Sequence, residues 1–243
     1  MATRRDRLRA ATVREISETA RRILIEQGPD AVTLRAIARE MGMTAPALYR
    51  YFGSHGELLR HLIGEIFTEL TAELIAAAKG VPPDDMSAKF LEVARQFRRW
   101  AHAHPREYAL LFGVPVRGAG EQDETDFAQE CARQFGWTFM SLFLELWKKR
   151  PFPVPADDDI PADLRDQLAR YRADLGVSLP LGVVLQFLKC WVRLQGAVSL
   201  EVFGHLEFAL DDPEPMFELM LGELAAILNL PYAPPGSAPP SAS

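Results

Sequence analysis

The sequence has few cysteines and no long apolar run. Its two cysteines, Cys131 and Cys190, are too few for a disulfide framework or a zinc-ligand cluster, and both lie in apolar helical stretches typical of small buried residues. No apolar run approaches the ~18–20 residues that a membrane span requires. The charged start, residues 3–7, lacks the apolar stretch of a signal peptide. We therefore expect a cytoplasmic protein that does not enter a membrane and holds neither a metal nor a cofactor.

Motifs of catalysis are also scarce. None of the five histidines sits in a metal-ligand pattern, and the sequence contains neither a glycine-rich phosphate loop nor a Gly-x-Ser-x-Gly elbow. We expect no catalytic residues, although an all-helical enzyme whose reactive groups meet only in space stays open as an alternative. A protein that uses its arginines on a membrane surface is a third alternative. Glu15 and Glu18 argue against it, because the first expected helix then has no wholly basic face.

Charge is distributed unevenly along the chain. The net charge is −6, yet residues 1–60 hold 11 arginines and only 7 acidic residues. The remaining residues hold 16 basic and 26 acidic side chains. A basic first quarter on an acidic body indicates a small module that binds a polyanion, carried by a larger domain with another task.

Helical periodicity dominates, and strand and hairpin signals are nearly absent. We expect an all-α fold in which an N-terminal three-helix module is joined by a long helix to a helical C-terminal domain. Thr12 and Glu15 predict the start of the first helix as a capping box, and Gly28-Pro29 predicts its end. The expected helices cover residues 12–27, 34–41, 45–52, 54–79, 87–103, 105–112, 124–149, 163–175, 180–203 and 213–229.

Three domains follow from this pattern: residues 1–60, residues 61–230 and a tail, 231–243. The tail consists largely of Pro, Ala, Ser and Gly and is expected to be disordered. Residues 150–159 form a proline-rich acidic loop that we expect to be mobile.

The first domain has the pattern of a helix-turn-helix. Thr33 caps its second helix, Gly42 makes the turn, and Thr44 caps a short third helix in which Leu48 and Phe52 face the core. Tyrosine rings and an arginine on the outer face of such a helix suit thymine methyls, guanine edges and phosphates in a DNA major groove. The outward residues, and therefore the expected base-reading set, are Thr44, Ala45, Pro46, Ala47, Tyr49, Arg50 and Tyr51.

Flanking residues suit contacts with the DNA backbone. Thr33 and Arg35 start the second helix and His55 opens the fourth, so all three are expected near phosphates. A basic arm before the first helix is expected to reach phosphates or a minor groove; it consists of Arg4, Arg5, Arg7 and Arg9. The alternatives are a packing helix whose tyrosines cover the fourth helix, a solvated His55 and an ordinary disordered N-terminus.

Residues 12–60 resemble the N-terminal domain of the tetracycline-repressor (TetR) family. The resemblance rests on residues 32–38, on the turn 41–44, on Pro46-Ala47-Leu48-Tyr49-Arg50-Tyr51-Phe52, and on Ser54 followed by residues 57–59. The family usually has a lysine at the position of His55, which implies a weaker or pH-sensitive phosphate contact here. The resemblance implies a homodimer that binds double-stranded DNA at a palindromic operator, most simply as a repressor.

The later helices resemble the sensor domain of the family's Trp-His-Gly subgroup. The matching stretches are residues 97–101, 104–112 and 191–201, and the chain has Gln195-Gly196 where the subgroup has His-Gly. The resemblance implies an all-helical sensor domain and a homodimer. Because these helices offer aromatic residues and few ionisable groups, we expect a small apolar or amphipathic ligand that releases the DNA; a ligand-independent regulator is the alternative. Candidate ligand-contacting residues are Trp100, Phe112 and Trp191, with His102 and Gln195 as polar groups, although core packing explains each aromatic as well.

The last two long helices are the expected dimer interface. Each carries apolar residues every three or four positions, and two such pairs can form a four-helix bundle across a two-fold axis. The alternative is that these faces are buried within one protomer. The residues are Val184, Phe187, Leu188, Trp191, Leu194, Val198 and Val202 in the first helix, and Phe217, Met220, Leu221, Leu224, Ala225 and Leu228 in the second.

Overall fold

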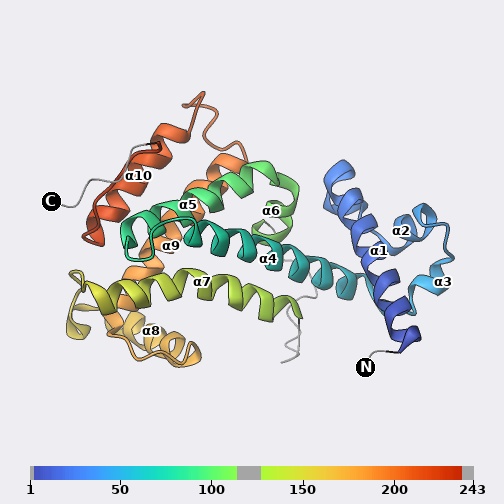
Figure 1. Ribbon diagram of the computed structural model, residues 1–243, viewed down its shortest axis with the longest axis horizontal. Coiled ribbons are helices and arrows are strands. Elements are labelled where there is room, and N and C mark those ends of the chain that lie inside the picture. Colours follow the sequence, from blue (N-terminus) through green and yellow to red (C-terminus); the bar gives the residue numbers. More distant parts are fainter. Residues whose placement is uncertain (1–2, 114–126, 237–243) are drawn as a thin grey trace. The chain divides into compact units, whose positions relative to one another are not determined.

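The computed structural model describes residues 3–113 and 127–236, and within those ranges it contains helices and no strand (Figure 1). The expected all-α fold is confirmed. Each helix expected beyond residue 80 has a counterpart whose described ends differ by at most two residues; the expected start of the helix at residue 124 lies outside the described residues. The elements are α1 Arg4–Gln27, η1 Pro29–Ala31, α2 Leu34–Glu40, α3 Ala45–Leu48, α4 His55–Lys79, α5 Met86–Ala103, α6 Pro105–Phe112, α7 Phe127–Lys149, η2 Asp157–Asp159, α8 Ala162–Asp174, α9 Leu181–Val202 and α10 Glu214–Ile227.

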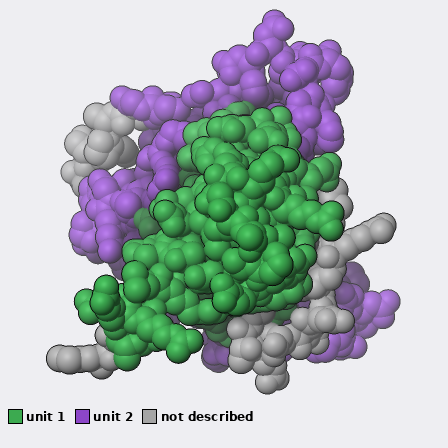
Figure 2. Space-filling model, turned by 90° about the vertical axis from the view of Figure 1, so that its right-hand side faces the viewer, with its two compact units in different colours: residues 1–72, 100–136 green, residues 73–99, 137–243 purple. Residues whose placement is uncertain are grey.

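The helices group into two compact units, each assembled from separate stretches of the chain. Unit 1 comprises residues 1–72 and 100–136, and unit 2 comprises residues 73–99 and 137–243 (Figure 2). Helices α4, α5 and α7 each contribute residues to both units. The functional division expected between residues 60 and 61 stays a prediction.

Helix α1 begins eight residues earlier than the sequence pattern predicted. Thr3 caps it: the Thr3 hydroxyl accepts from the Asp6 amide at 3.2 Å, and the Asp6 carboxylate accepts from the Thr3 amide at 2.9 Å. The Thr3 hydroxyl also donates to the Asp6 carboxylate at 2.8 Å, and this bond, together with the one from the Thr3 amide, lowers the pKa of Asp6. Thr12 instead donates to the Leu8 carbonyl inside the helix. The expectation of a basic arm before the first helix is therefore wrong, because its four arginines lie on the first two turns of α1. Their contact with phosphates stays a prediction.

The core of unit 1 is built on the inner stripe of α1. Residues three and four apart on this helix lie on one face, and α1 packs against α2 and α6. The Thr33 hydroxyl accepts from the Ala36 amide at 3.1 Å and caps α2, as expected. Gly42 adopts φ 64°, the left-handed turn that favours glycine. The fully buried members of this core include Ile16, Ala20, Ile23, Leu24, Ile37, Leu48, Leu58, Leu62 and Ile66.

In unit 2 the acidic loop after α7 is anchored rather than free. Phe152 is 3% exposed, and its ring packs edge-on against Phe143 and Trp147, with centroids 6.1 and 5.3 Å away. Gly182 at the start of α9 lies so close to the Pro155 carbonyl that a Cβ atom there would clash with the oxygen. The expectation of a mobile loop overlooked this single aromatic anchor.

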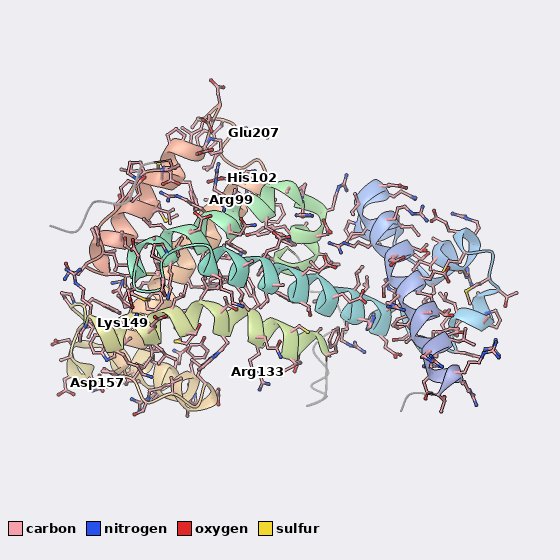
Figure 3. All side chains as sticks on the ribbon, viewed as in Figure 1. Arg99, His102, Arg133, Lys149, Asp157 and Glu207 are labelled. Carbon is pink, nitrogen blue, oxygen red and sulfur yellow. The ribbon has the colours of Figure 1, made fainter. Side chains whose placement is uncertain are left out.

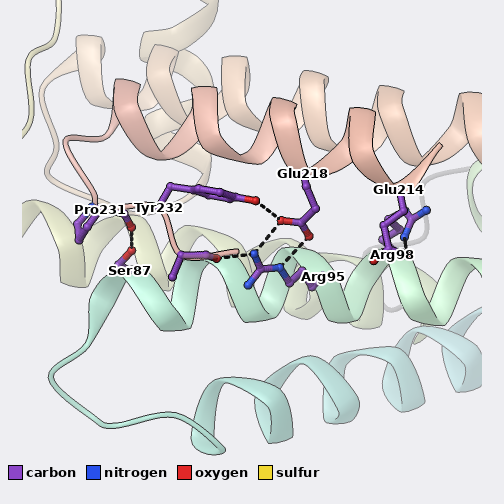
Figure 4. Close-up of polar contacts among 8 residues, drawn as sticks. Ser87, Arg95, Arg98, Glu214, Glu218, Pro231 and Tyr232 are labelled. Atoms are coloured by element: carbon purple, nitrogen blue, oxygen red, sulfur yellow. Dashed lines mark hydrogen bonds and ion pairs between the residues drawn. The ribbon is translucent and has the colours of Figure 1, made fainter. Parts of the chain in front are cut away.

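The beginning of the tail is also packed, contrary to the expected disorder from residue 231 (Figure 4). Ser87 donates to the Pro231 carbonyl, Tyr232 donates to Glu218 at 2.7 Å, and Arg95 donates to the Ala233 carbonyl at 2.7 Å. The expectation of disorder rested on how little apolar surface the tail can bury, and it failed here because polar contacts hold this segment. Residues 237–243 lie outside the described residues.

The apolar faces expected to form the dimer interface are largely buried within the protomer. Val184, Phe187, Leu194 and Val198 of α9 and the inner residues of α10, such as Leu221, belong to the core. The length and mean hydropathy of α9 are those of a membrane span, but half of it is buried inside the protein, as in an ordinary core helix. The exposed apolar residues of the two helices lie on their other faces and are Val192, Leu200, Met216 and Leu219.

Two isoleucines of α1 provide a matched test of this packing. Ile23 is 1% exposed and Ile25 is 49% exposed. Ile23→Ala removes buried methyl groups and leaves a cavity, so it is expected to lower the free energy of unfolding by about 2–5 kcal/mol. Ile25→Ala is expected to change it by less than about 0.5 kcal/mol. Urea unfolding followed by circular dichroism measures both, and equal losses would contradict this core.

Candidate functional site

The recognition segment is a short helix followed by a turn. Helix α3 ends at Leu48 rather than residue 52, but the Tyr51 and Phe52 amides still donate to the Leu48 carbonyl at 2.9 and 3.2 Å. Leu48 and Phe52 are buried, as the spacing predicted. Burial of these two side chains turns the remaining residues of the segment outward.

The outward residues form a small, mostly polar face. Thr44, Pro46, Tyr49 and Arg50 are exposed, while Ala45, Ala47 and Tyr51 are half-buried. The Thr44 hydroxyl makes no cap hydrogen bond in the part of the chain that the structure describes. Small side chains thus alternate with a tyrosine, an arginine and a hydroxyl, a combination that permits close approach to base edges.

Arg9 of α1 supports the end of this face. Its guanidinium donates to the Arg50 carbonyl at 3.3 Å and lies 5.4 Å from the centre of the Tyr51 ring. Tyr51 is therefore partly covered by an arginine, whereas the sequence pattern predicted a fully outward ring. The contact joins two segments 41 residues apart, so no local pattern could predict it.

A basic cleft lies beside the recognition segment. It has a volume of about 680 Å³, and its lining contains four arginines and no carboxylate. Exposed guanidinium groups suit phosphate oxygens, since each can donate several parallel hydrogen bonds. The lining residues are Arg4, Arg5, Leu8, Arg9, Thr12, Arg50 and Tyr51.

The other residues expected near the DNA backbone lie at the starts of α2 and α4. Arg35 is exposed in the first turn of α2, next to the capping residue Thr33. The His55 ring hydrogen-bonds the Val32 carbonyl, so it ties the start of α4 to the residues before α2. Its side chain is thus already engaged, and a phosphate contact by His55 stays a prediction.

An ion pair that sequence reasoning missed holds α1 in place. The Arg21 guanidinium donates to Glu107 of α6 and to Glu69 of α4, both at 2.7 Å, and Glu107 is 2% exposed. Burial alone would lower the pKa of Arg21, but the bonds to Glu69 and Glu107 outweigh it, and the pKa is raised. The partners lie 48 and 86 residues away in sequence, which is why no motif revealed them.

The expected ligand residues fall in different aromatic clusters. In unit 1, Trp100 is buried and stacks on His104 at 5.0 Å, while Phe112 packs on Tyr108 at 4.9 Å. His102 is exposed on α5 (Figure 3).

In unit 2, the ring centroid of Trp191 lies 5.4 Å from that of Phe139 and 5.9 Å from that of Phe97. Gln195 donates to Ser199 at 2.9 Å. Ligand contact by these residues stays a prediction.

A basic, outward-facing recognition segment on a three-helix core defines the class of helix-turn-helix proteins that bind DNA. Comparisons with known proteins identify the family. A model of bacterial regulatory proteins of the tetR family matches residues 16–62, and one of tetracyclin repressor-like C-terminal domains matches residues 90–224. The chain therefore belongs to the TetR family of DNA-binding transcriptional regulators. The resemblance to the Trp-His-Gly subgroup stays a prediction.

Individual relatives agree with this assignment. The chain is 32% identical over 217 residues to the HTH-type transcriptional regulator Rv1816 of Mycobacterium tuberculosis, covering 88% of this chain and 91% of the relative. The match to Mb1846 of Mycobacterium bovis has the same extent. The crystal structure of SCO4313 is similar with a TM-score of 0.71 and 28% identity, over 92% of this chain and all of that one. A protein of unknown function from Rhodococcus sp. RHA1 has a TM-score of 0.64 and 20% identity, covering 89% and 93% of the two chains, and supports the fold alone.

Two neighbouring arginines test the ion pair. Arg21→Met leaves Glu107 buried without its partner and is expected to lower the free energy of unfolding by about 3 kcal/mol, at the lower end for breaking a buried pair. Arg22→Met removes a pair with Glu40 on the surface and is expected to cost about 0–1 kcal/mol. Chemical denaturation measures both, and a loss for Arg21→Met no larger than that for Arg22→Met would show that the pair contributes little.

Proposed function

We propose that this regulator is a repressor that binds a palindromic operator as a homodimer and is released from it by a small apolar or amphipathic ligand, in the cytoplasm. The observation that carries the DNA-binding part is the exposed recognition face next to a cleft lined by four arginines. Base edges would be read by Tyr49 and Arg50, with Thr44 and the small residues between them at close approach. Phosphates would lie in the basic cleft and near Arg35.

Dimerisation follows from the size of the recognition segment. One short helix contacts only a few base pairs, and a two-fold partner doubles the number of base pairs that the protein recognises. The exposed apolar side chains on α9 and α10 support such an interface, since Val192 is 66% and Leu219 61% exposed. These residues replace the buried faces that the periodicity alone indicated.

Release by a ligand requires two conformations with different affinities for DNA. A ligand that bound both equally would change nothing, however tightly it bound. A coupling of about 1–3 kcal/mol would weaken operator binding about 5–150-fold, and the operator would weaken ligand binding by the same factor. The ion pairs of Arg21 with Glu107 and Glu69 are a suitable element for this coupling, because they join α1 to both α6 and α4.

Substitutions in the recognition face test DNA reading. Tyr49→Ala and Arg50→Ala are each expected to weaken binding to an operator selected from random duplexes by about 1–3 kcal/mol. Arg5→Ala in the cleft is expected to reduce the log–log salt slope by about 0.9 for one lost phosphate contact. Arg133→Ala, on α7, is the control and should leave both unchanged. Titrations by fluorescence anisotropy would reject the proposal if no duplex were retained at low salt.

The dimer interface is tested by adding charge to the exposed apolar face. Val192→Glu combined with Leu219→Glu is expected to convert a dimer into a monomer at micromolar concentration, because buried unpaired carboxylates are costly. Ile25→Glu places the same charge on an exposed residue of α1 and should leave the dimer intact. Sedimentation velocity distinguishes the species. A wild-type chain that is monomeric with and without operator DNA would refute the dimer.

A further inference from the structure

Unit 2 contains a pocket that none of the predicted ligand residues lines. It has a volume of about 530 Å³, within the range of ~300–1,000 Å³ typical of small-molecule sites. Its wall comes from the last turn of α4, the loop that follows, the start of α5 and the middle of α7. The lining residues are Ile75, Ala78, Lys79, Val81, Pro83, Lys89, Thr138, Ser141, Leu142 and Glu145.

Most of the surface that lines this pocket is apolar. Ile75, Val81 and Leu142 offer aliphatic surface to a hydrocarbon chain, and Ile75 is exposed although it is a large hydrophobic residue. Ser141 donates its hydroxyl proton to the Thr138 carbonyl at 2.9 Å, so only its oxygen lone pairs face other partners. The wall therefore favours an apolar body over a polar one.

The charged groups of the pocket are unequally satisfied. The Lys89 ammonium, with 13% of its side chain exposed, lies 3.3 and 3.4 Å from the two carboxylate oxygens of Glu145. Lys149, labelled in Figure 3, approaches the same carboxylate at 3.0 Å and also pairs with Asp84 at 3.3 Å. The hydrogen bond from Lys149, with a smaller contribution from Lys89, lowers the pKa of Glu145. One carboxylate thus serves two lysines.

The lining has a net positive charge although the chain as a whole is acidic. Lys79 and Lys89 line the pocket against the single carboxylate Glu145, and Lys79 has no ion-pair partner within residues 3–113 and 127–236. An incoming anion could pair with Lys89 while Glu145 keeps Lys149. An incoming cation would instead have to compete with two lysines for Glu145. Charge therefore favours an anionic head group.

We propose that this pocket binds an amphipathic monocarboxylate, with its carboxylate on Lys89 and its hydrocarbon chain along Ile75, Val81 and Leu142. The proposal deepens the ligand response proposed above, because it names the ligand class and the site. The Lys89 ammonium is already largely removed from water, so the ligand does not have to desolvate it. Since the last turn of α4 forms one wall, occupancy bears directly on the helix that follows the recognition segment in the chain.

The head group is tested with three eight-carbon probes that differ only in charge. Sodium octanoate, octan-1-ol and octylammonium chloride are titrated into the full-length protein by isothermal calorimetry. Octanoate is expected to bind about tenfold more tightly than octan-1-ol, the equivalent of one charge-assisted hydrogen bond of ~1.4 kcal/mol. Octylammonium is expected to bind most weakly. Equal affinities, tighter binding of octylammonium or no binding of octanoate would each overturn the proposal.

Variants assign the preference to the site. Lys89→Met is expected to abolish the advantage of octanoate over octan-1-ol, and Lys148→Met, which alters an exposed lysine of α7 outside the lining, should preserve it. Ser141→Leu fills the pocket without changing charge and should weaken all three probes, which keeps the test valid if Lys89→Met does not fold. Unchanged octanoate binding in a folded Lys89→Met or Ser141→Leu protein would overturn the site.

Operator binding separates this proposal from the proposed function. If octanoate binds through Lys89 but leaves operator affinity unchanged, the pocket stands and the ligand response through it fails. If no operator is found, the DNA-binding proposal fails, while calorimetry still decides the pocket. If the operator complex forms but octanoate does not bind, the pocket proposal alone is refuted.

Discussion

The position of the proposed DNA-reading face depends on one buried carboxylate. Glu107 is 2% exposed, and its pairing with Arg21 at 2.7 Å is what makes that burial tolerable. Since the same guanidinium also holds Glu69, helices α1, α4 and α6 cannot move independently without exposing or orphaning a charge. Helix α1 in turn carries Arg9, which holds the end of the recognition segment through the Arg50 carbonyl. A charge constraint is thus passed along α1 to the recognition segment.

Unit 2 uses the same principle with different partners. Arg98 of α5 pairs with Glu201 of α9 at 2.6 Å and lies 5.1 Å from the centre of the Phe217 ring of α10. Arg95 binds Glu218 of α10 through two hydrogen bonds, and Tyr232 completes the group (Figure 4). Two arginines on one helix therefore fix the rotation of both α9 and α10. That rotation decides which apolar side chains of the two helices stay exposed.

The sequence predicted features whose causes are local. Thr33 caps α2, Gly28 ends α1, and the four-residue spacing of Leu48 and Phe52 turns both inward, because each effect involves only a few neighbouring residues. It placed the start of α1 too late because the apolar period begins at Val13, although Thr3 and Asp6 form a capping box of their own.

The sequence failed where causes are distant in the chain. An apolar stripe on α9 does not reveal whether it faces the same protomer or another, and the stripe expected at a dimer interface is largely buried within the protomer. In the same way nothing near Arg21 indicates Glu107, and nothing near Phe152 reveals that Phe143 and Trp147 receive its ring.

The two proposed binding sites use positive charge in opposite ways. The arginines of the basic cleft have no carboxylate in the lining, so each phosphate that binds there displaces counterions, and salt weakens that binding steeply. The Lys89 side chain is only 13% exposed and is paired in advance, so a ligand carboxylate would exchange one anion for another in a site that salt screens less. With both proposed sites, a higher ionic strength would shift the balance toward the ligand-bound, DNA-free protein even at a fixed ligand concentration. Such a regulator would respond to its ligand most strongly if DNA binding depended steeply on salt and ligand binding did not.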